Sequence, residues 1–227
     1  MTKTAGRKSS KKMQHHKRPP LEPKTERQKL YLNALKTSPQ TIVLGPAGTG
    51  KTYIAASYAS QMYLDKVIDK IVITRPHVSV GKDIGYLPGG VLEKATPWAM
   101  PTLDVLEQWM GKGVLDTSLK NGNIEIAPLA LMRGRSFENS FIIVDEAQNI
   151  TTHEIKMLLT RVAEGSKIVL NGDVQQSDLK DANGLAKIVE LSQKYAVNVP
   201  VIEFTIDDVV RSEVCKQWIS IFMQEKI

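Results

Sequence analysis

Short apolar runs alternate with longer amphipathic stretches through most of the 227-residue chain. The runs are rich in Ile and Val, which is typical of strands that are buried on both faces of a parallel sheet. Such strands are expected at residues 41–44, 70–74, 124–126, 141–144, 167–170 and 201–205. Helical periodicity predicts helices at residues 26–35, 53–59, 103–110, 184–193 and from about 212 onward. The alternation predicts an α/β fold in which helices cover both faces of a parallel sheet.

Two further segments carry local signals of their own. Thr151 and Glu154 have the spacing of a capping box, and apolar residues at positions 155, 158, 159 and 162 continue the helical pattern. Residues 75–101 are instead punctuated by Gly and Pro, which interrupt regular structure. We therefore expect a helix after Thr151 and a long irregular section between residues 75 and 101.

The first chemical signal is a complete G-x-x-x-x-G-K-[ST] pattern between the strand at 41–44 and the helix that follows it. Its residues are Gly45, Pro46, Ala47, Gly48, Thr49, Gly50, Lys51 and Thr52. A Gly-rich turn in this context directs backbone N–H groups and the positive helix end toward one point, which suits a triphosphate. Lys51 is expected to reach the β- and γ-phosphates, and the Thr52 hydroxyl to bind Mg²⁺. An ordinary Gly-rich turn is the alternative, but the full pattern favours a nucleoside triphosphate.

Two carboxylates, Asp145 and Glu146, end the apolar strand at 141–144. Ligands of parallel α/β sheets lie beyond the carboxyl ends of the strands, so both acids are expected to face the phosphate loop. Asp145 is the candidate for holding Mg²⁺ through its water shell. Glu146 is the candidate for polarising the water that attacks the γ-phosphate. Paired acids of this kind favour a hydrolase over a phosphotransferase, which needs no water activator.

A third polar turn, Gly172-Asp173-Val174-Gln175-Gln176, follows the next predicted strand. Gln176 is placed to sense the γ-phosphate and to transmit its loss. A plain polar turn is the alternative for this segment taken by itself. Beside the other two motifs, the sensor is the preferred interpretation.

Charge separates a tail from the rest of the chain. Residues 1–24 carry a net charge of +7 and the remaining residues −1, so the overall +6 belongs to the N-terminus. The tail has few apolar residues and is expected to be disordered in isolation. It is either an arm that binds nucleic-acid phosphates or a solubilising segment. A nucleotide-binding domain is then expected over residues 25–227.

Composition also excludes several classes of protein. The chain has one cysteine, Cys215, so an intramolecular disulfide is impossible and a reducing, cytoplasmic setting is expected. No apolar run approaches the ~20 residues that a membrane helix requires, and no apolar stretch follows the basic N-terminus as in a secretory signal. We therefore expect no membrane partner.

Together, the three motifs resemble the motor core of superfamily 1 helicases. The segment at 74–89, Thr-Arg-Pro-His-Val-Ser-Val-Gly-Lys-Asp-Ile-Gly-Tyr-Leu-Pro-Gly, is specifically similar to the PhoH family of ATPases. The similarity extends over about residues 26–212 and includes the segments at 133–137 and 159–161. It implies a RecA-like P-loop NTPase fold and an ATPase linked to RNA or single-stranded nucleic acid.

The resemblance also assigns roles to three residues. Arg211 resembles the arginine finger that stabilises the charge developing on the γ-phosphoryl group. Gln28 resembles the glutamine that reads the adenine edge, although spacing alone also allows a solvent-facing helix residue. Arg75 directly follows a predicted strand, as in the segment that helicase cores use against a nucleic-acid backbone.

Other basic and aromatic residues have two interpretations each. Arg133, Arg135 and Arg161 are candidate contacts to nucleic acid, and Arg133 and Arg135 have a structural pairing with acids such as Glu138 as the alternative. The aromatic candidates for stacking on bases are Tyr86 and Trp98, and burial in the core is the alternative for the Trp.

The sequence therefore predicts a single RecA-like domain that hydrolyses ATP with Mg²⁺ and acts on RNA or single-stranded nucleic acid. The alternative is an ATP-switched, oligomeric nucleic-acid-binding or scaffold protein whose hydrolysis is slow and incidental. With one phosphate loop, the nucleotide of a monomer would be half exposed to water, and a neighbouring subunit could close the site. We therefore expect a homo-oligomer, hexameric by resemblance, in which Arg211 of one subunit approaches the ATP of the next.

Overall fold

The computed structural model describes residues 18–76, 91–179 and 183–225. Six strands form one sheet in the spatial order β3-β2-β4-β5-β1-β6, and every neighbouring pair is parallel. The strands are β1 (Gln40–Leu44), β2 (Lys70–Thr74), β3 (Ile124–Ile126), β4 (Ser140–Val144), β5 (Lys167–Gly172) and β6 (Val201–Glu203). The six strands predicted from the apolar runs are therefore confirmed.

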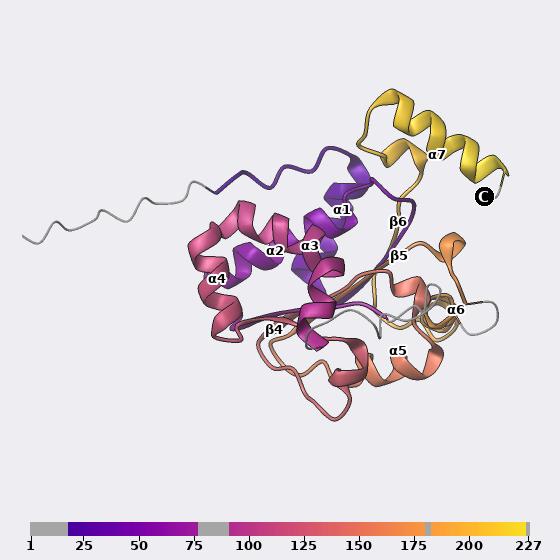
Figure 1. Cartoon of the computed structure of the whole chain (residues 1–227). Coiled ribbons are helices and arrows are strands. Elements are labelled where there is room, and N and C mark those ends of the chain that lie inside the picture. The colour runs from indigo at the N-terminus through magenta and orange to yellow at the C-terminus, as the bar shows by residue number, and fades with distance from the viewer. Residues whose placement is uncertain (1–17, 77–90, 180–182, 226–227) are drawn as a thin grey trace, which may run out of the picture.

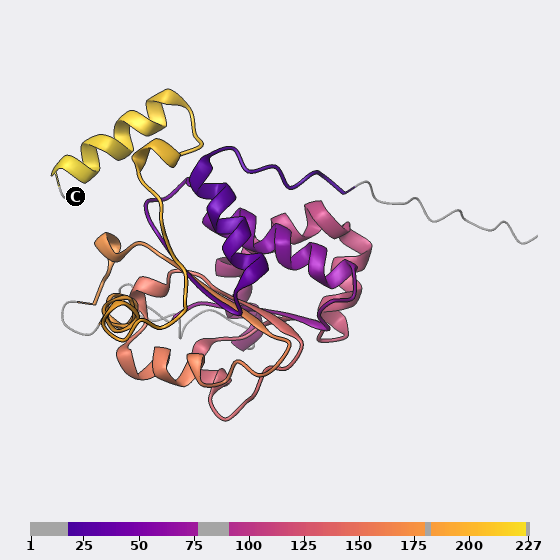
Figure 2. The same cartoon turned by 180° about the vertical axis from the view of Figure 1, so that it is seen from behind.

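Helices cover both faces of the sheet (Figures 1 and 2). One layer holds α1 (Glu26–Thr37), α2 (Lys51–Leu64), α3 (Val91–Met110) and α4 (Lys112–Lys120). The opposite layer holds α5 (Thr152–Leu159) and α6 (Gly184–Lys194), and α7 (Glu213–Glu225) extends away from the body of the domain. The predicted capping box begins α5: Thr151 Oγ1 accepts from the Glu154 N–H at 3.3 Å, and Glu154 Oε2 accepts from the Thr151 N–H at 3.0 Å.

The two layers rest on two hydrophobic cores, one on each face of the sheet. Successive residues of β4 alternate between them. Phe141 and Ile143 belong to the first core, with residues of α1, α2 and α3, whereas Ile142 and Val144 belong to the second core, with residues of α5 and α6. This alternation is the period-two geometry of a strand. Because both faces are buried, the strands read in the sequence as unbroken apolar runs.

The strand order brings three loops to the same edge of the sheet. β5 lies between β4 and β1, with Leu170 opposite Val144 and Gly172 opposite Leu44. The segments that leave the carboxyl ends of these three strands therefore start side by side. They are the phosphate loop after β1, the Asp145-Glu146 pair after β4 and the Gly172–Gln176 turn around the end of β5.

The Gly/Pro-rich section is more regular than predicted. Helix α3 begins at Val91 and contains both Pro97 and Pro101, although a proline cannot donate the backbone hydrogen bond of a helix interior. Burial against the first core compensates: Ala99, Leu103 and Leu106 of α3 are buried. Helix α4 was not predicted, and residues 77–90, the most family-specific part of the sequence, lie outside the described residues.

The last part of the predicted tail belongs to the folded domain. Arg18 forms an ion pair with Asp65 at 2.7 Å, and Leu21 packs against the first core. The Lys24 N–H donates to Gln28 Oε1 at 2.7 Å, one residue before Thr25 caps α1. Residues 18–24 therefore join the domain that was expected to begin at residue 25, and residues 1–17 are not described.

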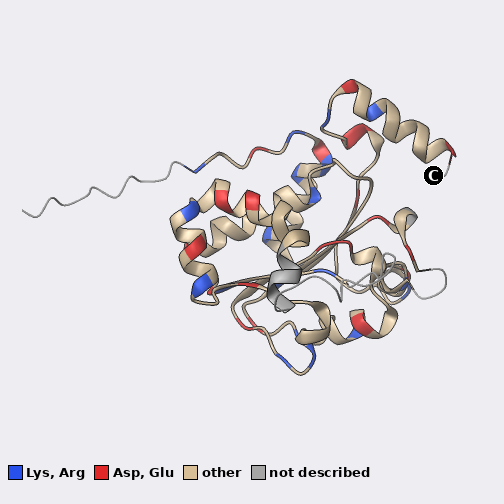
Figure 3. Cartoon of the chain, in the orientation of Figure 1, with Lys and Arg blue, Asp and Glu red and all other residues tan. Residues whose placement is uncertain are grey.

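Acidic and basic residues are interspersed over the described domain (Figure 3). This distribution agrees with the near-neutral charge of the sequence beyond residue 24. Among the described helices, none combines the length and apolarity needed to cross a membrane.

Candidate nucleotide-binding site

The phosphate loop depends on glycines at its bends. Gly45, Gly48 and Gly50 have φ angles of +135°, +85° and +87°, which side-chain-bearing residues rarely adopt. A Cβ on Gly45 would also lie 2.6 Å from the Phe204 carbonyl oxygen. The loop can therefore form only with glycine at this point, and it leads directly into α2 at Lys51.

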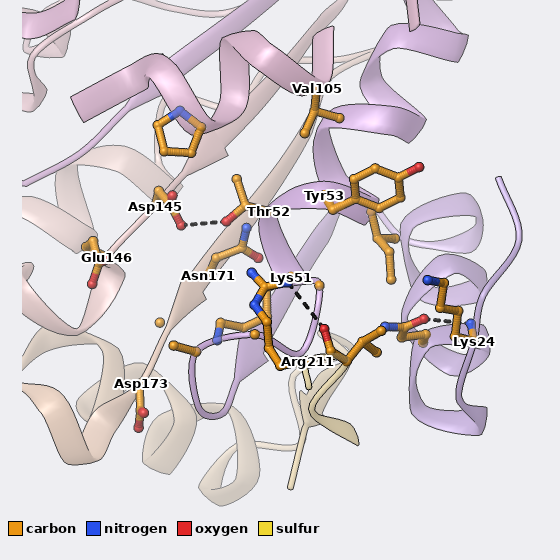
Figure 4. A pocket seen from close by; sticks show the side chains of 18 of the residues that line it. Lys24, Lys51, Thr52, Tyr53, Val105, Asp145, Glu146, Asn171, Asp173 and Arg211 are labelled. Atoms are coloured by element: carbon orange, nitrogen blue, oxygen red, sulfur yellow. Dashed lines mark hydrogen bonds between the residues drawn. The ribbon is translucent and has the colours of Figure 1, made fainter. Parts of the chain in front are cut away.

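Lys51 and Thr52 occupy the first turn of α2 and face the edge of the sheet (Figure 4). Lys51 Nζ donates to the Gly45 and Pro46 carbonyl oxygens at 2.5 and 2.8 Å. The Thr52 hydroxyl donates to Asp145 Oδ1 at 3.1 Å. The structure thus joins the predicted Mg²⁺ residues, which lie 93 positions apart in the sequence.

Burial changes the acid–base properties of this group. It lowers the pKa of Lys51 and raises the pKa of Asp145, because desolvation disfavours both charged forms. The neighbouring Glu146 carboxylate raises the pKa of Asp145 further, and the Thr52 hydrogen bond opposes both effects. Asp145 is consequently an acid whose negative charge would be stabilised by a bound cation.

Glu146 is held in an unusual conformation. Its φ and ψ of 52° and 40° lie in the left-handed region, which is uncommon for a residue other than glycine. Its carboxylate accepts a hydrogen bond from Gln148 Nε2 at 2.6 Å and lies 3.8 Å from the Arg75 guanidinium. The predicted water activator is therefore fixed by two neighbours.

Gln148 connects two of the predicted motifs, a role that the sequence interpretation missed. While its Nε2 donates to Glu146, its Oε1 accepts from the Asp173 N–H at 3.1 Å. The backbones at Gly172 and Gln148 also lie close together, because a Cβ on Gly172 would lie 2.9 Å from the backbone nitrogen of Gln148. The sequence signal for Gln148 is its place in the segment Asp145-Glu146-Ala147-Gln148, which resembles the corresponding motif of the helicase motor core.

Gln176 lies at the cavity but is exposed. Gln176 ends the 3₁₀ turn η4 (Val174–Gln176), and its Nε2 donates at 2.9 Å to Oδ2 of Asp173, the residue before that turn. The side chain lines the same cavity as Lys51 and Glu146. Its role as a sensor stays a prediction.

Arg211 lies over the phosphate loop of its own chain. The Val210 N–H donates to the Gly48 carbonyl oxygen at 2.9 Å, which fastens this segment to the loop. The Arg211 side chain passes so close to Gly48 that a Cβ there would lie 3.1 Å from its Cγ. In this conformation Arg211 lines its own cavity, whereas the sequence interpretation had it reach a neighbour's site.

Gln28 is buried against the phosphate loop. Its Nε2 donates to the Thr49 carbonyl oxygen at 2.9 Å, and its Oε1 accepts from the Lys24 N–H at 2.7 Å. The solvent-facing alternative is therefore wrong, since Gln28 is 5% exposed. Gln28 fixes the loop through its bond to Thr49, and its amide has one further hydrogen and one further lone pair at a position that lines the cavity. Recognition of adenine stays a prediction.

The remaining candidates divide between surface and structural positions. Arg135 forms a bidentate pair with Glu125, at 2.6 and 2.7 Å, so its structural partner is Glu125 rather than Glu138. Arg133 is exposed, and Arg161 is partly buried. Trp98 is partly buried against the first core, whereas Tyr86 lies outside the described residues.

One cavity of about 750 Å³ brings together the phosphate loop and the two polar segments that follow β4 and β5. Its size is suited to a nucleotide. Its walls include the phosphate loop, the two acids and Arg211. Pro20 and Glu22 also line it, although the sequence interpretation placed them in the tail. No group of three metal-ligating His, Cys, Asp or Glu occurs in the described part of the chain. Mg²⁺ does not need one, because it commonly takes one or two protein oxygens together with phosphate and water. The Thr52–Asp145 pair fits that requirement.

Solved structures with a similar fold include a helicase and a large terminase of bacteriophages. The UvsW helicase of bacteriophage T4 superposes with a TM-score of 0.51 at 15% identity, over 81% of this chain and 61% of that one. The large terminase of a thermophilic bacteriophage gives a TM-score of 0.56 at 13% identity, over 88% of this chain and 50% of that one. At these identities the likeness shows the fold, which is RecA-like as predicted.

Curated relatives are much closer in sequence. Protein PhoH of Escherichia coli K12 is 38% identical over 87% of this chain and 57% of its own length. The PhoH-like proteins of Synechocystis and Bacillus subtilis are 39% and 42% identical, over 84% and 83% of this chain and 62% and 59% of their own lengths. The chain thus spans about three fifths of these relatives. The profile described as PhoH-like protein matches residues 20–223. The chain therefore belongs to the PhoH family.

Proposed function

We propose that this protein hydrolyses ATP with Mg²⁺ and couples hydrolysis to binding or remodelling of RNA or single-stranded nucleic acid. The observation that supports hydrolysis most directly is the Thr52–Asp145 hydrogen bond beside Lys51 and Glu146 in one cavity. Hard oxygen ligands, a phosphate-binding cation and a separate carboxylate are the parts that phosphoryl transfer to water requires.

Each residue has a distinct role in this proposal. The loop N–H groups and Lys51 bind the phosphates, and Thr52 and Asp145 hold Mg²⁺, whose charge offsets that of the phosphates when it is bound. Glu146 polarises the attacking water, and Arg211 stabilises charge on the γ-phosphoryl group. Gln148 positions Glu146 through its amide.

Coupling to nucleic acid is supported by Arg75. This residue follows β2 and lies 3.8 Å from the Glu146 carboxylate. A nucleic-acid phosphate that drew Arg75 away would leave Glu146 held by Gln148 and freer to act on water. The helicase and terminase folds support the same assignment by analogy alone.

The test is steady-state phosphate release from ATP with and without single-stranded RNA, with Lys51→Ala as the inactive control. We expect Mg²⁺-dependent release that RNA stimulates. No release above the Lys51→Ala control under either condition would contradict the proposal.

The alternative, an ATP-switched scaffold with slow hydrolysis, is favoured by the restraint of Glu146. Both Gln148 and Arg75 hold its carboxylate in this conformation. Measurable ATP binding with turnover that neither RNA nor single-stranded DNA changes would support the switch.

We also propose that the protein forms a head-to-tail homo-oligomer, with a hexameric ring as the expected closure. Helix α7, all of whose residues are described, buries none of them. It exposes Val214, Trp218 and Phe222, and it starts two residues after Arg211. A subunit that covers the start of α7 would therefore lie close to Arg211, which lines the cavity. A cytoplasmic setting is part of this proposal and is supported by the single cysteine.

Mixing Lys51→Ala with Arg211→Ala subunits tests which subunit uses Arg211. If Arg211 acts on its own chain, as its contact with Gly48 favours, mixed assemblies should regain no ATPase activity. Partial recovery would instead support the arrangement across subunits. Sedimentation of a fully active monomer would contradict the oligomer.

A further inference from the structure

Asn171 is a buried polar residue at the cavity, and half of its amide lacks a partner. The residue is 0% exposed and yet lines the cavity. Its Oδ1 accepts a hydrogen bond from the Tyr31 hydroxyl at 3.2 Å. Its Nδ2 finds no acceptor among the residues that the structure describes. Buried donors are nearly always paired, so this one calls for an explanation.

The strand register places Asn171 beside the phosphate-binding residues. On β5, Asn171 stands opposite Val43 of β1, and Leu170 before it stands opposite Val144 of β4. Asn171 therefore lies level with Asp145, the residue after Val144, and beneath the loop that follows β1. In Figure 4 its amide is drawn between Lys51 and the Thr52–Asp145 pair.

Tyr31 determines which end of the amide faces the cavity. It is fully buried, and burial, with a smaller effect of Asp145, raises its pKa, so the hydroxyl remains a donor. The same hydroxyl lies 3.3 Å from the Lys51 carbonyl oxygen. When the hydroxyl donates its single hydrogen to Oδ1, Nδ2 is left as the unpartnered end of the amide, at a residue that lines the cavity.

We propose that Asn171 Nδ2 donates a hydrogen bond to the terminal phosphate of a bound nucleoside triphosphate, and that Tyr31 holds the amide in this orientation. The inference rests on the proposed function, because a triphosphate must occupy the cavity. A diphosphate offers no oxygen at that point, so Asn171 distinguishes ATP from ADP. It complements Gln176, whose exposed amide is bonded to Asp173.

The experiment compares the affinities of ADP and of a non-hydrolysable ATP analogue, both with Mg²⁺, in the full-length protein. Asn171→Ala should weaken the ATP analogue by about tenfold, because a hydrogen bond to a charged group is lost, and leave ADP within about twofold. Asn171→Asp should weaken binding of the ATP analogue more than Asn171→Ala does, since a carboxylate cannot donate a hydrogen bond and repels the phosphate. Tyr31→Phe keeps the ring against Phe204, at 6.0 Å between centroids, and should cause a smaller loss of the same selectivity.

Three outcomes would overturn the inference. An equal loss for ADP and the ATP analogue in both Asn171→Ala and Tyr31→Phe would make Asn171 merely structural. Wild-type affinity for both nucleotides in Asn171→Ala would mean that Nδ2 bonds to buried water instead of to the terminal phosphate. Wild-type affinity in Asn171→Asp would mean that an oxygen faces the cavity, as a metal ligand would. A wild-type protein that binds neither nucleotide would instead contradict the proposed function itself.

Discussion

Two clusters of acids and cations in this domain differ in how fully the acids are paired. Glu125 accepts two hydrogen bonds from Arg135, at 2.6 and 2.7 Å, and one from Lys70 at 3.0 Å. These partners, Arg135 first, lower the pKa of Glu125 from 4.5 to about 2. At the cavity, burial raises the pKa of Asp145, and the adjacent Glu146 raises it further.

The difference separates a structural cluster from a binding site. Around Glu125, the cations satisfy the acid, and Arg135 also lies 4.9 Å from the centre of the Phe137 ring. At the cavity, two acids are adjacent in the chain and Lys51 donates to loop carbonyls instead of to them. A bound cation would stabilise the charge of Asp145, and an acid whose pKa is perturbed inside a cavity is a candidate functional residue.

The largest expected effect comes from exchanging one acid of each cluster for its amide. Glu146→Gln should bind ATP but lose at least about 100-fold in turnover, because the amide cannot accept a proton from water. Glu125→Gln is the matched control and should keep turnover within about twofold. Phosphate release and nucleotide affinity are measured for both. A Glu146→Gln protein with wild-type turnover would remove the distinction between the clusters.

Nucleotide affinity should show the next largest effect. Lys51→Ala removes the cation that is expected to meet the β- and γ-phosphates and should weaken ATP by about 10-fold or more. Arg135→Ala removes a cation from the other cluster and should leave ATP affinity unchanged. Titration with a fluorescent ATP analogue measures both. An equal loss in the two variants would indicate a general loss of folding, which thermal melting checks.

Much of the cavity was predictable because its motifs are contiguous. The phosphate loop, Asp145-Glu146 and Gly172-Asp173 each follow an apolar run, and parallel strands place all three at one edge. The strands were predictable because burial on both faces leaves uninterrupted apolar residues. Helical periodicity predicted residues 103–110 of α3, but Pro97 and Pro101 argued against its earlier part, which begins at Val91, because the burial that compensates for them is not visible in a local pattern.

Contacts between distant residues explain the rest of what was missed. Tyr31 and Asn171 are 140 positions apart, and the sequence contains no signal that links them. Arg135 had a plausible partner in Glu138, but β3 brings Glu125 to it instead. Gln148 looked like part of a motif, and only the turn after Glu146 reveals that it also reaches Asp173. Motifs made of neighbouring residues could thus be predicted from the sequence, whereas contacts between distant side chains could not.

A smaller effect should appear in the dependence of stability on pH. The folded-state pKa of Glu125 is depressed, so its contribution is fully present above the unfolded value of 4.5 and is lost as pH falls toward about 2. Glu125→Gln should lower the free energy of unfolding by about 1 kcal/mol near neutral pH, a value discounted for solvent screening. The difference from wild type should shrink across that acidic range. Urea denaturation at several pH values measures it, and a constant difference would contradict the paired state of Glu125.

The smallest effect concerns positive charge that belongs to neither cluster. Residues 1–17 carry a charge of +6 and precede Arg18, the first described residue. If they form a phosphate-binding arm, their deletion should make the slope of log affinity for RNA against log salt shallower by ~2, as about three lost phosphate contacts would. Basal ATPase activity should not change, because residues 18–24, which contribute to the cavity, are retained. A tail of equal length with its Lys and Arg replaced by Gln is the matched control and should behave like the deletion. An unchanged slope in both variants would show that the tail only solubilises the protein, and would leave nucleic-acid binding to the folded domain.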